Sequence, residues 1–437
     1  MAMCRPGRVI WPLSLLIVAA AATSRCVAAD ENGPLDAGPL SLSAVLQQAR
    51  RQNPDIKAAE ARLQAMQQRP VQEGTLPDPS LSVRYHNESF DQITFGESDF
   101  SFVELQGEQE IPFPGKLRLR TRMATRDAER ERAMRDMTVL MVLAEAASRY
   151  AELAAVDRSD AILRESRQAL EVIVQEASTS YGVGTAAQTD VLRAKLERAG
   201  LDERFTMLAQ QRAAGSAALN ALLDRSAGEV LGRAVWRPEL GALEPLPMLQ
   251  EQLAAASPQL RAATEELVRS EDAVELARRD YLPDFAVMAA YTNKDDLLPE
   301  WEVGVRMSVP LYFWRRQGPA LAEARYARAA AEHGRRNVHL TLVQRLAELH
   351  SMAKAARRLV ALYHETLIPQ ASITLESARA SYAVGRVDFL DVLSAFTALL
   401  EYRLRETEEV ARYQQTHAAI GPLIGALPNG ATEEVGP

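Results

Sequence analysis

The chain has 437 residues, of which 47% are hydrophobic and 25% charged, with 50 Lys and Arg against 58 Asp and Glu. This composition is typical of globular proteins and excludes collagen, low-complexity disorder and a bundle of membrane-spanning helices. The formal net charge of −8 argues against a nucleic-acid-binding surface, which needs an excess of basic residues.

Residues 1–29 have the layout of a secretory signal peptide. Two arginines lie near the start, residues 9–22 are almost wholly apolar, and three small residues end the segment. The apolar run is shorter than the roughly 20 residues that a membrane-spanning helix needs. The only cysteines are Cys4 and Cys26, so the mature chain is predicted to contain no disulfide. Lipidation of Cys26 is an alternative, although Arg25 stands where lipoproteins have a small residue.

After the signal peptide, the sequence repeats itself once. The matching segments are 53–59 with 257–263 at an offset of 204, Leu-Pro-Asp at 76–78 with 282–284 at 206, and 181–192 with 382–393 at 201. A period of about 200 residues is too long for a solenoid and indicates a duplicated domain. We therefore expect a first repeat over 30–224, an equatorial linker over 225–249, a second repeat over 250–425 and a tail over 426–437.

Each repeat is predicted to begin with a helix and to continue with two strands. Asn53-Pro54 and Ser257-Pro258 each provide a polar N-cap followed by proline at the first helical position. The period of the apolar residues then changes from 3.6 to 2, which predicts strands at about 80–111 and about 285–309.

The predicted strands have one apolar face and one polar face. Trp301, Val303 and Val305 alternate with Glu302 and Gly304, for example. Such strands suit a membrane barrel between lipid and a wet lumen, and a soluble sandwich edge is the alternative. Four strands cannot close a barrel, so several chains must assemble: two would supply eight strands and three would supply twelve. The glutamates on the polar faces favour a wet lumen and therefore three chains.

Long helical hairpins are predicted after each strand pair, over about 115–224 and about 319–425. Residues 116–180 contain neither proline nor glycine, and a helix of about 65 residues would reach roughly 100 Å. In the second repeat, a coiled-coil stripe with 4-3 spacing comprises Leu342, Leu346, Leu349, Ala353, Ala356, Val360, Tyr363 and Leu367. Each long helix ends at a glycine turn, and helices return from about Ala187 and Phe389. The expected fold class is mainly α with a membrane β-barrel part.

The duplicated layout, the two Tyr-x-Val-Gly turns followed by Asp-Val-Leu, and the Leu-Pro-Asp before the strands resemble the TolC family of outer-membrane efflux proteins over about residues 40–425. The resemblance implies a homotrimer with a twelve-stranded outer-membrane barrel that a long α-helical barrel continues into the periplasm. It also implies a periplasmic adaptor (membrane fusion protein) and an inner-membrane pump of the RND type as partners. Residues 109–116, Gln-Glu-Ile-Pro-Phe-Pro-Gly-Lys, resemble the branch that serves heavy-metal cation efflux.

The same resemblance implies roles for residues at the two helical turns. The adaptor-docking tips would be Val183, Gly184, Thr185, Val384, Gly385 and Arg386. The periplasmic gate would comprise Asp190, Tyr382, Asp391 and Asp388. A second acidic position of the family corresponds to Ser394 here, and the arginine of the family's gate corresponds to Val387.

No motif for catalysis is present in the sequence. No two of the six histidines stand four residues apart, and neither a phosphate-binding loop nor a nucleophile elbow occurs. We therefore expect no enzyme activity, no cofactor and no resident metal. The competing hypotheses are a soluble periplasmic coiled-coil adaptor or scaffold, and an exit duct for drugs or for a secreted protein rather than metal ions. The sequence does not identify the cargo.

Overall fold

The computed structural model describes residues 38–88, 90–95, 98–184, 186–238, 240–295 and 297–428. The predicted signal peptide with Cys26, the tip residue Thr185, and the tail beyond residue 428 lie outside the described residues.

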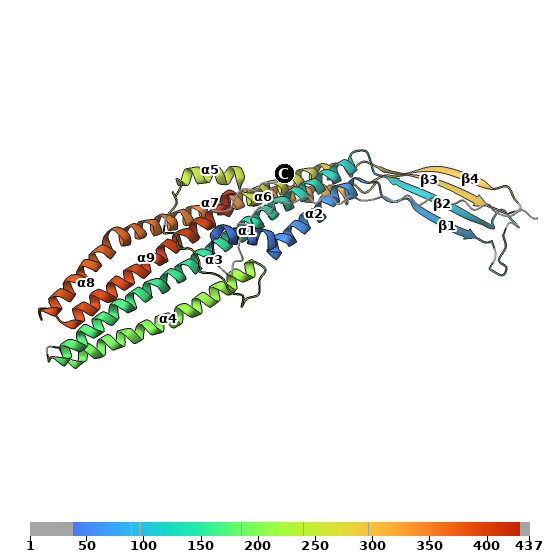
Figure 1. Cartoon of the computed structure of the whole chain (residues 1–437). Coiled ribbons are helices and arrows are strands. Elements are labelled where there is room, and N and C mark those ends of the chain that lie inside the picture. Colours follow the sequence, from blue (N-terminus) through green and yellow to red (C-terminus); the bar gives the residue numbers. More distant parts are fainter. Residues whose placement is uncertain are drawn as a thin grey trace, which may run out of the picture.

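The described chain is a long, narrow wall with a small sheet at one end and helices along the rest (Figure 1). The elements in chain order are α1 Leu42–Gln52, α2 Pro54–Gly74, β1 Ser80–His86, β2 Phe102–Ile111, α3 Lys116–Gly182, α4 Gln188–Leu222, α5 Leu246–Ala256, α6 Pro258–Arg279, β3 Asp284–Asn293, β4 Glu300–Ser308, α7 Gln317–Leu362, the π-helix η1 Tyr363–Leu367, α8 Ile368–Ala383 and α9 Phe389–Ile424. The turns that join α3 to α4 and α8 to α9 lie together at the end opposite the sheet.

The two halves of the chain contain corresponding elements in the same order, with α7, η1 and α8 together in the place of α3. The helices α1 and α5, which the sequence analysis missed, have 11 residues each and precede the capped starts of α2 and α6. The Asn53 side chain caps α2 by accepting hydrogen bonds from the backbone N–H groups of Asp55 and Ile56, at 2.9 and 3.3 Å. At the equivalent position, Ser257 makes no side-chain cap bond. The duplicated order of elements predicted from the sequence is therefore present.

The four strands form one antiparallel sheet in the order β1-β2-β3-β4. Directly opposed residues share a face, so the register assigns every side chain to one side of the sheet. One face carries rows such as Val83, Leu105, Tyr291 and Trp301, and these apolar side chains are exposed, Trp301 by 79%. The opposite face carries the glutamates of β2 and β4 together with ion pairs such as Arg84–Glu104. The predicted division into an apolar and a polar face is confirmed.

The helical part is a single layer in which helices pack side by side. The 67-residue helix α3 lies between α2 and α6 near the sheet and between α4 and α9 farther away (Figure 1). Its buried residues face neighbouring helices, as Leu143 does near α1 and Leu170 does near α9. Because a layer of this kind has no enclosed centre, the core consists of separate apolar clusters between adjacent helices.

The second long helix is not continuous as the sequence analysis expected. The coiled-coil stripe is buried from Leu342 to Ala356, but α7 ends at Leu362 and the π-helix η1 follows it. Pro369 lies two residues after η1 and has no N–H to donate, so the wider turn accommodates the missing hydrogen bond. The path from Gln317 to Ala383 still matches α3 in length.

A buried lysine joins the sheet to the helices. The side chain of Lys116, at the start of α3, is 3% exposed, and its Nζ lies 3.0 Å from Asp284 and 3.4 Å from Asp280. The same Nζ donates to the carbonyl of Leu282 at 3.2 Å, and Asp284 also accepts a hydrogen bond from the Phe113 N–H at 2.7 Å. These bonds hold the end of α6 and the start of β3 against the start of α3.

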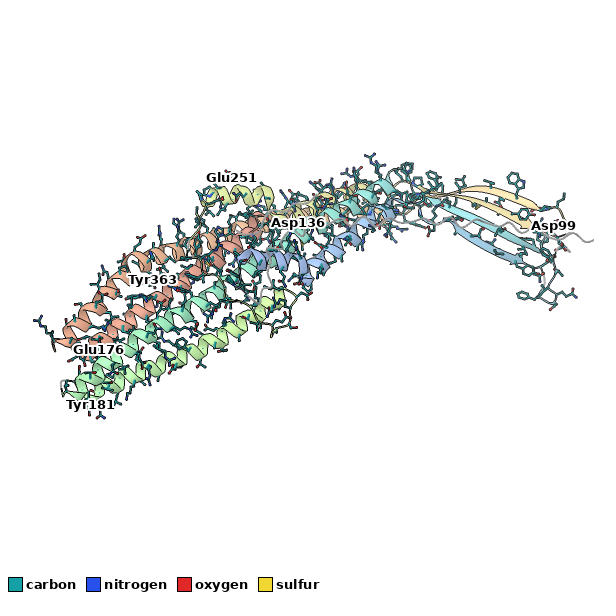
Figure 2. All side chains as sticks on the ribbon, viewed as in Figure 1. Asp99, Asp136, Glu176, Tyr181, Glu251 and Tyr363 are labelled. Carbon is teal, nitrogen blue, oxygen red and sulfur yellow. The ribbon has the colours of Figure 1, made fainter. Side chains whose placement is uncertain are left out.

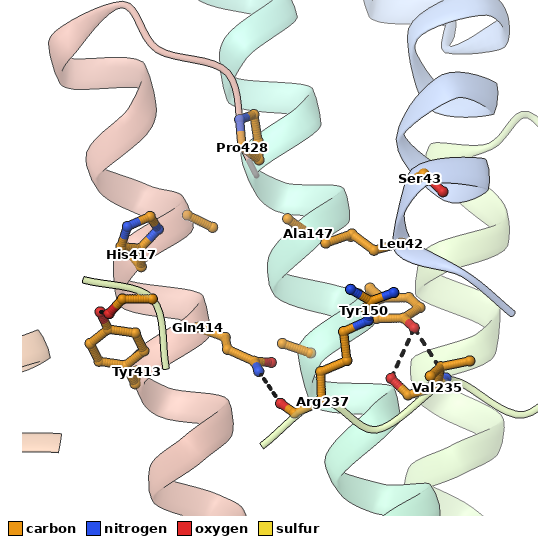
Figure 3. A pocket seen from close by; sticks show the side chains of 13 residues that line it. Leu42, Ser43, Ala147, Tyr150, Val235, Arg237, Tyr413, Gln414, His417 and Pro428 are labelled. Carbon is orange, nitrogen blue, oxygen red and sulfur yellow. Dashed lines mark hydrogen bonds between the residues drawn. The ribbon is translucent and has the colours of Figure 1, made fainter. Parts of the chain in front are cut away.

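The segment that links the two repeats crosses the helices at mid-length and borders a cavity of about 290 Å³ (Figure 3). The Tyr150 hydroxyl donates to the Leu40 carbonyl at 2.9 Å and accepts from the Val235 N–H at 3.1 Å. Gln414 donates to the Arg237 carbonyl at 2.7 Å, and burial lowers the pKa of His417 on the same helix. This packing fixes the linker segment against α1, α3 and α9.

Among the described residues, no helix combines the length and the apolar character needed to cross a membrane.

Candidate functional site: the two hairpin tips

The first tip joins α3 to α4. The chain turns at Gly184, which has a φ of +78° and whose N–H donates to the Tyr181 carbonyl at 3.0 Å. A left-handed φ of this size costs a residue with a side chain about 1–2 kcal/mol, which is why glycine occupies the position. Val183 is 72% exposed beside it. Of the three residues predicted for this tip, Val183 and Gly184 lie at the end of the hairpin, and Thr185 is outside the described residues.

The second tip joins α8 to α9 with the same geometry. Gly385 has a φ of +70°, its N–H donates to the Tyr382 carbonyl at 2.9 Å, and the Arg386 N–H donates to the Ser381 carbonyl at 2.9 Å. This pair of bonds is a Schellman motif, in which a left-handed glycine ends a helix. Val384 is 66% exposed, and a Cβ built on Gly385 meets no atom within 4 Å. Both tips therefore present an apolar side chain and open space to solvent.

Tyr382 of the second hairpin packs against an apolar cluster that contains residues of both hairpins. Its ring packs edge-on against Phe389, with centroids 5.5 Å apart, and Phe389 is only 1% exposed. Burial, with smaller contributions from the charges of Asp190 and Glu176, raises the pKa of the Tyr382 hydroxyl. That hydroxyl is buried and has no hydrogen-bond partner among the described residues of its own chain. The structure thus brings the predicted gate residues Tyr382 and Asp190 near each other without a hydrogen bond between them.

An ion pair that the sequence analysis missed joins the two hairpins just above the tips. Arg379 of α8 donates to Glu176 of α3 at 2.5 Å, across 203 residues of sequence. Figure 2 shows Glu176 near Tyr181, at the tip end of the wall. Glu176 and Arg379 each lie a few residues before the tyrosine of a Tyr-x-Val-Gly turn. Their similar positions in the two repeats are a sequence signal for this ion pair.

The other two predicted gate residues lie in and just before the first turn of α9. Asp388 is the N-cap residue without a side-chain cap bond, and Asp391 is in the first turn, where a carboxylate favourably meets the positive end of the helix. Both are exposed, whereas Phe389 and Val392 in the same turn of the helix are buried. Neither forms an ion pair with another described residue.

The described residues contain no group of three or more His, Cys, Asp or Glu side chains that could hold a metal ion. The geometry at the tips offers turns, carboxylates and a buried tyrosine rather than a nucleophile with its base.

A family model described as "Outer membrane efflux protein" matches residues 45–225 and 249–426. The cobalt-zinc-cadmium resistance protein CzcC of Cupriavidus metallidurans is 23% identical over 397 residues, covering 89% of this chain and 91% of CzcC. The solved structure of the outer membrane protein VceC from Vibrio cholerae matches with a TM-score of 0.75 at 19% identity, covering 88% of this chain and 96% of VceC. A structure of CusC matches with a TM-score of 0.76 at 14% identity, covering 88% and 92% of the two chains.

The chain belongs to the outer membrane efflux protein family, since the model matches most of its length. Its fold is that of the TolC-like outer-membrane channels, with a sheet at one end and a long helical part. The sequence-based assignment to this family, to this fold class and to the outer membrane is confirmed. The proteins of this family are efflux channels and not enzymes, in agreement with the expectation.

Proposed function

We propose that the chain forms a homotrimer that serves as the passive exit duct of a tripartite efflux system. Three copies of the four-stranded sheet would give twelve strands in one outer-membrane barrel. A periplasmic adaptor and an inner-membrane pump, of the RND type, would complete the assembly and supply the driving force. The soluble adaptor or scaffold that the sequence left open is disfavoured, because the chain belongs to a family of outer-membrane proteins.

The observation that carries this proposal is the exposed apolar face of the sheet together with its two unpaired edge strands. Among the described residues, the strands β1 and β4 each have a neighbouring strand on one side only. An open edge in lipid would leave backbone N–H and C=O groups without partners, at several kcal/mol each. Closure with other copies removes both edges, and the apolar face then meets lipid while the glutamates line the lumen.

For the cargo we propose divalent heavy-metal cations as substrate. CzcC, whose name states resistance to cobalt, zinc and cadmium, matches nearly the whole chain, although at only 23% identity. Several of the solved channels with this fold carry no metal in their names, so the fold by itself does not distinguish metal from drug cargo.

Deletion of the gene from its host tests the cargo. We expect the inhibitory concentrations of cobalt, zinc and cadmium to fall and those of hydrophobic drugs to remain unchanged, with recovery on complementation by the intact gene. Loss of drug resistance with unchanged metal resistance would contradict the proposal that metal ions are the cargo, but it would agree with the proposal of an exit duct. A detergent-corrected mass of one or two chains would contradict the trimer itself.

We propose that the tips dock the adaptor. Val183 and Val384 are the exposed apolar groups there, and changing them leaves the left-handed glycines untouched. Val183→Asp with Val384→Asp should abolish efflux while the trimer still assembles, because a carboxylate in an apolar contact is costly to desolvate. Bulky residues in place of Gly184 and Gly385 should have the same effect, with added backbone strain. Full efflux in both double variants would exclude docking at the tips.

We also propose that Asp391 forms a ring of three carboxylates in the periplasmic mouth, with Asp388 beside it. Such a ring creates a negative potential that selects cations. Asp391→Ala should weaken cation selectivity and block by multivalent cations in planar bilayers. If Asp391 only stabilises its helix, the variant would cost up to about 1 kcal/mol and leave selectivity unchanged.

The Tyr382 hydroxyl and Asp190 are the proposed closing contacts of the mouth. Because the hydroxyl has no partner among the described residues of its own chain, Tyr382→Phe removes no bond within the protomer. A rise in the open fraction of single channels in this variant would therefore report a bond to another protomer. An unchanged open fraction would remove Tyr382 from the gate.

A further inference from the structure

The two repeats meet inside one chain, and this internal interface predicts how one chain meets the next. Strand β2 of the first repeat pairs with β3 of the second. In a ring of copies, β4 of the second repeat must meet β1 of the next first repeat, which is the same kind of junction. We call this β4–β1 pairing between protomers the seam.

The repeats can be superposed strand by strand from the sequence. Strand β1 corresponds to β3 at an offset of 206, from Leu76-Pro77-Asp78 and Leu282-Pro283-Asp284. Strand β2 corresponds to β4 at an offset of 198, from Ile111-Pro112 and Val309-Pro310. The hairpins supply an independent check, because the pair Leu81–Gly107 becomes Val287–Val305 under these offsets, and that pair exists in the second hairpin.

We propose that the protomers join in a single register at the seam, with Val305 of one protomer opposite Val83 of its neighbour. Under the two offsets Val305 corresponds to Gly107 and Val83 to Ala289, and Gly107 pairs with Ala289 within the chain. The adjoining pairs are then Val303 with Tyr85 and Met307 with Leu81. The inference rests on the proposed assembly and specifies its contacts.

The faces of the sheet agree with this register. Val83, Tyr85, Val303 and Val305 all lie on the apolar face, so the seam continues that face from one protomer to the next. A slip of one residue would place glutamates of β4 opposite apolar residues of β1 and is excluded. Only slips of an even number of residues remain as alternatives.

The geometry of a closed barrel is also met. A path that steps from each residue to its paired neighbour crosses the four strands and the seam and reaches β1 of the next protomer four residues farther along that strand. Three protomers therefore give the barrel a shear number of about 12, which corresponds to a strand tilt of about 35°. A slip of two residues in one direction would give a tilt of about 19°, which is too small, and a slip in the other direction would give about 46°, which the cross-linking experiment below distinguishes from the proposed register. The usual tilt of such barrels is about 35–45°.

Charges at the base of the sheet fit the same junction. Within the chain, Asp284 of the second Leu-Pro-Asp binds Lys116 at the start of α3. Its equivalent Asp78 is exposed, and Arg315 and Arg316 just before α7 are exposed as well. None of the three forms an ion pair with another described residue of the chain. The seam would bring Asp78 of one protomer to these arginines of the next, as the counterpart of the Lys116 contact.

Disulfide formation between introduced cysteines can measure the register of the seam. The chain's only cysteines, Cys4 and Cys26, precede the described residues and do not lie in the strands. Three double variants of the full chain combine Val305→Cys with Leu81→Cys, Val83→Cys or Tyr85→Cys, and all of these positions lie on one face. Directly opposed residues have Cβ atoms about 4.5–5.5 Å apart, and diagonal neighbours lie farther apart. Oxidation should therefore form the disulfide in the variant with Val83→Cys several-fold faster than in the variants with Leu81→Cys or Tyr85→Cys. The products should be covalent dimers and trimers.

The control is Val287→Cys with Val305→Cys, which are opposed within one chain and should form an internal disulfide without oligomers. Fastest cross-linking in the Leu81 or Tyr85 variant would overturn the proposed register. Absence of covalent oligomers in all three variants, while the control closes and light scattering in detergent reports a trimer, would overturn the seam but not the exit duct. A monomer by light scattering would overturn both.

Discussion

Val303 and Glu302 provide the sharpest test of which face of the sheet meets lipid. They are neighbours on β4 with side chains on opposite faces, and Val303 is 62% exposed in the single chain. Val303 belongs to the middle one of five rows on the apolar face, between the row of Tyr85 and the row of Met307. Five rows span about 27 Å along the strands, or about 22 Å along the membrane normal at the tilt of about 35° that the proposed seam gives. Val303 therefore lies near the middle of the bilayer.

A lysine at the middle of the bilayer costs a membrane strand about 2–4 kcal/mol, so Val303→Lys should lower the folding equilibrium constant about 30- to 800-fold per chain. Glu302→Lys changes charge on the lumen side and should cost less than about 1 kcal/mol while altering ion selectivity. Denaturant titration of the protein in phospholipid vesicles measures the first effect, and conductance measures the second. Equal destabilisation by the two variants would show that the faces are assigned wrongly.

Three further predictions concern the helical part, and thermal unfolding followed by circular dichroism checks each. Lys116→Met should destabilise the chain by about 1–3 kcal/mol, because it leaves two half-exposed carboxylates close together without their cation; an unchanged melting temperature would contradict this. Asn53→Ala should lower the free energy of unfolding by about 1–2 kcal/mol, because it removes the cap of α2. The equivalent Ser257→Ala should change it by less than about 0.5 kcal/mol, since the Ser257 hydroxyl is buried without a hydrogen-bond partner among the described residues. Equal losses of stability in the two variants would refute the reasoning. Hydrogen bonds from Arg164 and then Arg233 lower the pKa of Asp160 from 3.8, so this carboxyl stabilises the fold above its ordinary pKa and loses that contribution as pH falls through the lower folded value. Asp160→Asn should therefore destabilise at pH 7 and match the parent chain in strong acid, and a difference that persists there would disprove the linkage.

Local patterns in the sequence were sufficient to predict the elements and the class of protein. Alternation with a period of 2 predicted which strand residues share a face, because successive side chains of a strand point to opposite sides. Asn53-Pro54 predicted the start of α2, and glycine after Tyr-x-Val predicted the two turns, where φ is positive. The domain boundaries, the docking tips and the gate remain predictions.

Some features left a local signal that the sequence analysis did not use. Pro369 could have indicated an interruption of the second long helix, because a proline inside a helix removes a backbone donor. The helices α1 and α5 precede equivalent cap residues at the same offset of 204 that relates Asn53 to Ser257. The repeat therefore extends to the N-terminal side of Asn53 and Ser257.

The order and register of the strands and the contacts between the repeats were decided only by the tertiary structure. Alternation tells which face a side chain occupies, but it is unchanged when a strand slips by two residues or exchanges neighbours. Arg379–Glu176 and Lys116–Asp284 join residues that are 203 and 168 apart in sequence. No local pattern specifies such pairs, because they exist only after two long helices lie side by side and bring particular turns of each to the same height.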